Sequence, residues 1–234
     1  MRLLRKIIII LLLLISVLYL SSEVKARPMK KIAVIDGGFN LRIAPAETRA
    51  KLCKSGHFDF TRNKAMLGYQ RDSHAVIVSN AIVKNIKHNN YCIVIYKVVG
   101  DRHNKLGTIN AAVKRAFRKG LDAVNISLIT NAYQEEFYRT IKTVMRRSKM
   151  YIFVAAGNDN RDLDKVCNMY PACYKINNPK FRVIGSVDYR FRSGYSNYGS
   201  IIHNYENGMQ NGFFGTSFAS PKALGKYINA LEKR

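Results

Sequence analysis

The sequence predicts an α/β domain built on a mainly parallel central sheet. Short apolar runs rich in β-branched residues alternate with longer amphipathic segments, which is the order expected of β-α-β units. The runs are continuously apolar, as in strands that are buried on both faces of a parallel sheet. A chain of 234 residues is long enough for one such domain with a sizeable core.

The expected elements follow one another at the spacing of such units. Turn-forming residues end the strands, for example Asp36-Gly37 after the first run and Gly100 after the second. The helix that ends at Gly120 has its apolar residues on one face, and Arg146-Arg147 suit the negative end of the next helix dipole. The expected strands are residues 32–35, 91–99, 121–128 and 151–156, and the expected helices are 75–83, 108–119, 132–148 and the segment after Pro221.

Residues 1–26 have the features of a secretory signal peptide. Arg2, Arg5 and Lys6 precede about fourteen mostly apolar residues, which is short for a membrane span. We expect cleavage after Ala26, with residues 27–234 forming the exported domain, secreted or periplasmic, and no propeptide before the first strand. An uncleaved N-terminal membrane anchor is the alternative.

The formal net charge is +24, which is far from that of an average domain. Loss of residues 1–26 removes four basic residues and one acidic residue and leaves +21. Such a field favours acidic partners, among them acidic polymers and anionic lipid surfaces, although a solvated surface that keeps the protein soluble accounts for it equally well. No nucleic-acid-binding motif accompanies the basic residues, so we expect no specific nucleic-acid partner.

The four cysteines all lie in the part expected to be exported. An even number in an oxidising compartment favours disulfides, with three connectivities open. Cys167 and Cys173 would close a short loop and are the first choice, which leaves Cys53 to pair with Cys92. No cysteine or histidine spacing suggests a zinc site, and we expect no metal among the site residues.

Polar side chains of types that can take part in catalysis follow the predicted strands or lie at the start of the predicted helices. Asp36 follows the first strand, and Asn158 follows the fourth; ligand and catalytic sites gather at the carboxyl ends of such strands. His74 lies in the first turn of a buried helix. Ser217 lies among small residues ahead of a helix, where unpaired N–H groups and the helix dipole can hold an oxyanion.

Four segments resemble the motifs of the subtilases, the subtilisin-like serine proteases of peptidase family S8. They are IAVIDGGFN, DSHAVIVSNA, VAAGND and GTSFASP, and they carry Asp36, His74, Asn158 and Ser217 in that order. The resemblance extends over nearly all of residues 31–232, and within it residues 182–188 resemble the family's next strand. It implies a three-layer α/β/α subtilisin-like fold, a catalytic triad of Asp36, His74 and Ser217, and an oxyanion hole containing Asn158.

The resemblance also implies where substrate binds. The strand that carries Ser127, Leu128 and Ile129 resembles the family's substrate channel, which pairs with an extended peptide, and Ala155, Ala156 and Gly157 would line its other side. The family usually has two glycines where this chain has Ile129-Thr130. Subtilases often bind calcium in loops, but the sequence identifies no such site, and no cofactor is expected.

The implied function is that of a secreted, monomeric serine endopeptidase acting on polypeptides through an acyl-enzyme. The motif around His74 departs from the family, with Ala75, Val76 and Ile77 in place of the usual glycine, threonine and second histidine. The alternative is therefore a catalytically impaired subtilase-fold module that binds acidic envelope polymers or membranes through its basic surface.

Overall fold

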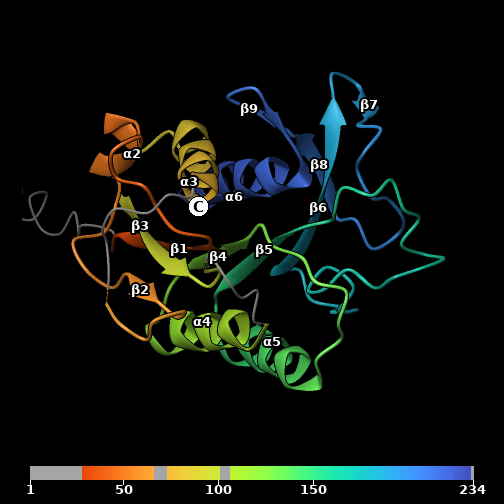
Figure 1. The fold of residues 1–234 in the computed structure, drawn as a ribbon, viewed down its shortest axis with the longest axis horizontal. Helices are drawn as coiled ribbons and strands as arrows, with labels where there is room; N and C mark the ends of the chain where they lie inside the picture. Colours follow the sequence, from red (N-terminus) through yellow and green to blue (C-terminus); the bar gives the residue numbers. More distant parts are fainter. Residues whose placement is uncertain (1–27, 66–72, 101–105, 233–234) are drawn as a thin grey trace, which may run out of the picture.

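An eight-stranded, mostly parallel sheet forms the middle layer of the protein, with helices on both of its faces (Figure 1). The computed structural model describes residues 28–65, 73–100 and 106–232. The signal peptide expected over residues 1–26 lies outside the described residues.

The sheet has the strand order β2-β3-β1-β4-β5-β6-β7, and β8 also pairs with β6. β1 is an interior strand, because it pairs in parallel with β3 on one side and with β4 on the other. β7 is antiparallel to β6, and β9 and β10 form a separate two-stranded sheet. The strands are β1 Lys30–Asp36, β2 Phe58–Asp59, β3 Tyr91–Lys97, β4 Ala123–Ile126, β5 Tyr151–Ala155, β6 Phe181–Asp188, β7 Phe191–Arg192, β8 Asn204–Asn207, β9 Met209–Gln210 and β10 Phe213–Phe214.

The helices divide the core into two apolar layers. α3 and α6 cover one face of the sheet and α4 and α5 cover the other, as Figure 1 shows. Val78 and Leu224 belong to the first layer, and Ile109 and Phe137 belong to the second. The helices are α2 Ala46–Ala50, α3 His74–Asn85, α4 Leu106–Arg118, α5 Glu135–Arg147 and α6 Thr216–Glu232. The expected three-layer α/β/α architecture, its main strands and its main helices are thereby confirmed.

The start of the last helix differs from the expectation. The sequence predicted a helix after Pro221, but α6 begins at Thr216, so Pro221 lies inside it. Proline has no N–H and cannot donate to the carbonyl four residues earlier, which is that of Ser217. That carbonyl instead accepts a hydrogen bond from the Ser127 hydroxyl at 2.7 Å, so the helix continues through the proline without an unsatisfied acceptor there.

Both expected cysteine pairs are present as disulfides, Cys53–Cys92 and Cys167–Cys173. The first joins the segment before β2 to β3. His57 lies buried beside it, where its Nε2 is 2.7 Å from the Cys53 carbonyl and its Nδ1 accepts from the Ile95 N–H at 3.0 Å. These partners require a neutral imidazole with the proton on Nε2.

This buried histidine makes stability depend on pH. Burial lowers the pKa of His57 from its ordinary value of 6.5. Because the unfolded chain binds the proton more readily, the stability that His57 contributes is complete above pH 6.5. It declines as the pH falls below that value, by up to about 1.4 kcal/mol per pH unit. Urea unfolding across this range should show a smaller decline for His57→Gln than for the wild type. Equal declines would contradict the assignment.

Candidate active site

The candidate site lies at the carboxyl ends of the central strands. Asp36 ends β1, Ser127 follows β4, and Asn158 follows β5. The first turns of α3 and α6 meet the same edge, since the rings of His74 and Phe218 lie 5.5 Å apart. The topology thus brings together side chains that are separated by as many as 181 residues in the chain.

Asp36 and His74 form a direct pair. The Asp36 side chain is 1% exposed, and its Oδ1 lies 2.7 Å from His74 Nδ1. The same oxygen accepts from the Gly37 N–H at 2.7 Å. A carboxylate accepts only, so Nδ1 carries a proton, and in the neutral imidazole Nε2 carries the lone pair. Ala75, Val76 and Ile77, which depart from the family motif, are buried in the apolar layer with α6.

Ser217 is held by a chain of hydrogen bonds behind it. The Ser220 hydroxyl donates to Asn125 Oδ1 at 2.8 Å, and Asn125 Nδ2 donates to the Ser127 hydroxyl at 2.9 Å. Ser127 in turn donates to the Ser217 carbonyl, as described above. Asn125 and Ser220 are fully buried, so these bonds are shielded from water. The Ser217 hydroxyl itself donates to the Ser127 carbonyl at 3.3 Å.

Asn158 is oriented by its neighbour across the site. Its Oδ1 accepts from the backbone N–H of Thr216 at 2.8 Å and from the Thr216 hydroxyl at 2.9 Å. That hydroxyl also accepts from the Gly157 N–H at 3.1 Å. Since both interactions hold the oxygen, the Nδ2 donor points away from Thr216. It lies beside Gly215, where an added Cβ would be 3.3 Å from it.

Two segments of the chain face each other next to this site. Ser127, Leu128 and Ile129 follow β4, and Ala155, Ala156 and Gly157 end β5 and continue beyond it. The Ile129 side chain reaches across, because a Cβ added at Gly157 would lie 3.2 Å from Ile129 Cδ1. Gly157 has φ +104°, which suits glycine, and a Cβ there would also lie 2.3 Å from Asn197 Nδ2.

A model of the subtilase family matches residues 30–232. The chain belongs to the subtilase family. Membership of this family of serine peptidases makes the protein a serine endopeptidase. The polar cluster just described contains the side chains that the family resemblance singled out.

Solved structures of proteases share the fold. A lanthipeptide protease superposes with a TM-score of 0.70 at 20% identity, covering 88% of this chain and 75% of that one. A cold-adapted subtilisin-like serine proteinase gives a TM-score of 0.69 at 20% identity, with 88% and 77% covered. A protease from Pseudoalteromonas arctica gives 0.66 at 18% identity, with 85% and 76% covered. No curated protein sequence matches the chain.

In this subtilase, the loop that carries Asn158 is held by hydrogen bonds to a residue that the sequence did not identify as part of the site. Asn197 is fully buried and donates through Nδ2 to the Ala156 carbonyl at 3.0 Å. Its Oδ1 accepts from the N–H groups of Asp159 at 3.1 Å and Arg161 at 2.9 Å. The amide therefore bridges both ends of the turn. No periodicity marks Asn197, because its role depends on a contact about forty residues away.

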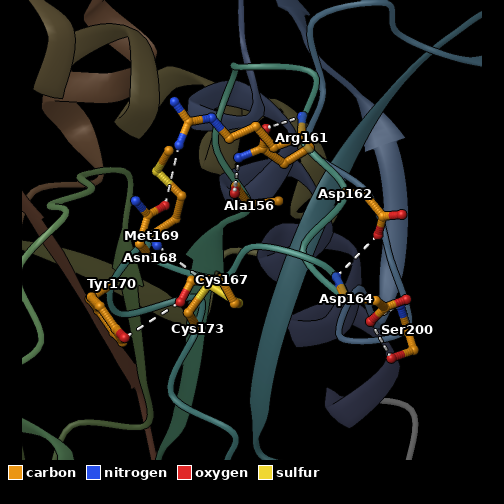
Figure 2. Close-up of a disulfide and its surroundings, with 11 residues drawn as sticks. Ala156, Arg161, Asp162, Asp164, Cys167, Asn168, Met169, Tyr170, Cys173 and Ser200 are labelled. Atoms are coloured by element: carbon orange, nitrogen blue, oxygen red, sulfur yellow. Dashed lines mark hydrogen bonds between the residues drawn. A yellow bond between two sulfur atoms is a disulfide. The ribbon is translucent and has the colours of Figure 1, made fainter.

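The second disulfide closes the loop that follows Asn158 (Figure 2). Next to it, the Cys173 sulfur accepts from the Met169 N–H, and Arg161 reaches Asn168. Further along the loop, Asp164 accepts from the N–H and hydroxyl of Ser200. These bonds with the loop over 197–200 lower the pKa of Asp164 below its usual value.

The hydrogen-bond chain behind Ser217 consists of Ser220, Asn125 and Ser127. Of these three residues, the sequence identified only Ser127. A signal for Asn125 exists, since polar residues two apart in an apolar strand point to the same side. Within the described residues no group of three or more histidine, cysteine or acidic side chains could hold a metal ion. The expectation that the protein holds no cofactor and no metal at the site residues remains a prediction. In the described part of the chain, no helix is long and apolar enough to span a bilayer.

Thr216 should act as a positioning residue for Asn158. We expect Thr216→Val to lower kcat for peptide cleavage about tenfold with little change in KM, because the valine keeps the backbone N–H bond to the amide oxygen but loses the hydroxyl bond. Thr216→Ser keeps the hydroxyl and should retain most of the wild-type kcat. Steady-state kinetics of the two variants on one peptide substrate make the comparison. Equal kcat values for valine and serine would contradict the role.

Proposed function

We propose that the protein cleaves polypeptides through an acyl-enzyme formed on Ser217, with His74 as the general base and Asp36 as its orienting partner. The observation that carries the proposal is the 2.7 Å contact between His74 Nδ1 and a buried carboxylate. It leaves Nε2 as the basic nitrogen on the side of the ring away from Asp36.

In the acylation step the Ser217 oxygen forms a bond to the peptide carbonyl carbon while its proton passes to His74 Nε2. The imidazolium that results is stabilised by Asp36. When the carbon–nitrogen bond breaks, the same proton passes to the leaving amine. Water then attacks the ester by the reverse sequence of proton transfers and releases the acid.

Asn158 would stabilise the tetrahedral oxyanion. Its Nδ2 donor is directed by Thr216, and the residue is exposed at the site. The backbone N–H of Ser217 supplies a second donor, since the first turn of a helix gives its N–H groups no intrahelical acceptor. Both donors are fixed before substrate arrives, which is the condition for effective electrostatic stabilisation.

The substrate binds, in this proposal, as an extended strand beside residues 127–129. The side chain before the scissile bond must lie next to the oxyanion donors, and hence between Ile129 and Gly157. Beyond Ser217, a hollow of about 600 Å³ lined partly by Phe191, Tyr195 and Phe214 could accept the leaving side of the peptide. A binding surface on both sides of the serine suits an endopeptidase.

Export through residues 1–26 and a monomeric state belong to the same proposal. The two disulfides support an oxidising compartment. The alternative of an impaired binding module has less support, because the unusual residues after His74 face the core while the contact with Asp36 is made.

Ser217→Ala should abolish cleavage without unfolding the protein. We expect kcat/KM on a peptide substrate to fall by at least about a thousandfold, because no other group can form the acyl-enzyme. A fluorophosphonate probe should label wild-type Ser217 stoichiometrically, with the phosphorus–oxygen bond replacing the phosphorus–fluorine bond.

Circular dichroism and the thermal melting temperature provide the control for Ser217→Ala. Residual cleavage within about tenfold of the wild type would refute the assignment of Ser217. A folded wild-type protein that the probe fails to label would favour the binding module instead.

Ile129 should restrict the residue before the scissile bond to small side chains. The Ile129 side chain occupies space over Gly157 that a glycine would leave open. We expect Ile129→Gly to raise kcat/KM for phenylalanine relative to alanine at that position by at least about tenfold. Thr130→Gly is the matched control and should change the ratio little, since Thr130 pairs through its backbone with Tyr170. A profile on a peptide library measures both, and an unchanged ratio in Ile129→Gly would exclude this role.

A further inference from the structure

The edge of the sheet opposite the active site is strongly basic. The turns that lead into β1, β3, β4, β5 and β6 all lie there, and backbone hydrogen bonds join neighbouring ones, such as Lys30 to Asn90 and Tyr151 to Asp122. Each of these strands has at least one lysine in the segment before it or among its first residues. We call five of the exposed lysines in this region, one of which precedes β2, the basic edge: Lys31, Lys54, Lys87, Lys119 and Lys149.

Very little negative charge lies along these turns. Asp122 is their one acidic residue, and it is already occupied by the Lys30 ammonium at 3.1 Å and the Lys31 N–H at 2.9 Å. The ion pairs of the described residues include none of the five lysines of the basic edge. Their ammonium groups therefore add to one field rather than cancelling locally.

The ends of the helices extend this field. α4 and α5 run back from the active-site edge and end here with exposed Arg118, Arg146 and Arg147. Cations in the last turn offset the negative end of the helix dipole, which accounts for these arginines on structural grounds. The lysines of the basic edge lie in turns and at the start of β1, outside the helices, so the dipoles do not account for them.

We propose that the basic edge docks on an anionic phospholipid bilayer and holds the active site away from it. The five strands from β3 to β6 span roughly 20 Å at the usual strand spacing, so the charge is spread along a broad edge. Lysines on long apolar stems can place their ammonium groups among lipid phosphates on a flat surface. This proposal does not depend on the peptidase mechanism.

The path of the chain favours a membrane over a soluble polymer. The chain enters the domain at this edge, since β1 starts at Lys30, ten residues after Leu20 ends the apolar run of the sequence. Ten residues reach at most about 35 Å, so before cleavage, or in the alternative of an uncleaved anchor, a bilayer that holds the run is within reach of the edge. Exposed Met29 adds apolar surface beside Lys31.

A hollow at the edge fits the same partner. It has a volume of about 670 Å³, and Lys31, Lys51, Lys54 and Lys119 surround walls that include Tyr91 and Leu121. Cationic groups around an apolar floor suit a phospholipid headgroup and the start of its chains. Since β1 is seven residues long, docking at this edge would hold Asp36 about 20 Å above the lipid surface.

The test measures binding of the full chain to vesicles of phosphatidylcholine alone and with one quarter phosphatidylglycerol. The variant K54E/K119E/K149E reverses three charges of the basic edge. The variant R62E/K165E/R190E makes the same charge change at exposed positions beyond the carboxyl ends of the strands. The readout is the ratio of the two partition coefficients, compared between each variant and the wild type, because residues 1–26 are the same in all three proteins.

We expect the edge variant to lose at least tenfold of the preference for anionic vesicles and the control variant to lose less than threefold. Equal losses would show that net charge alone binds lipid and would overturn the proposal. A wild type that prefers heparin or RNA but not anionic vesicles would also overturn it, in favour of a soluble polyanion. Melting temperatures of both variants exclude unfolding as the cause.

Discussion

The buried carboxylate at the end of β1 is the constraint on which the candidate active site depends. Asp36 is nearly inaccessible, and a buried charge is tolerated only when it is paired and hydrogen-bonded. The Gly37 N–H and His74 Nδ1 meet that requirement at the same oxygen. In the described residues no donor reaches Oδ2, so the histidine contact carries much of the compensation. The first turn of α3 is thereby held against β1, and α6 packs beside α3 with Ser217 in its own first turn.

The large elements could be predicted because their signals are local. Runs such as Ile32–Ile35 are apolar on both sides only in a sheet covered on both faces, and the structure has that arrangement. The elements that were not predicted, such as α2 and β7 to β10, are short, and the longest has five residues. Segments of two to five residues contain too few repeats of the two-residue strand period or the 3.6-residue helix period to establish a pattern, so tertiary contacts determine their conformation.

The residues of the candidate site also fall into those that the sequence predicts and those that it does not. Motif resemblance named Asp36, His74, Asn158 and Ser217, the residues that carry the proposed mechanism. The residues behind them, among them Asn197 and Asn125, are polar groups whose partners lie far away in the sequence. Pro221 shows why: its effect on α6 can be read from proline chemistry, but the donor that satisfies the freed carbonyl comes from Ser127, ninety residues away.

One topology accounts for both edges of the sheet. In parallel β-α-β units every strand ends at one edge, where turns and helix N-termini gather donors that suit developing negative charge. The returning helices α4 and α5 end at the opposite edge, where their negative dipole ends favour basic residues. The turns at that edge add lysines beyond those that the helix dipoles account for, so in our proposals the two edges have different functions. Catalysis uses a few buried groups with defined hydrogen-bond partners, such as Asp36. Docking on a charged surface instead requires many exposed groups that lack partners within the described chain.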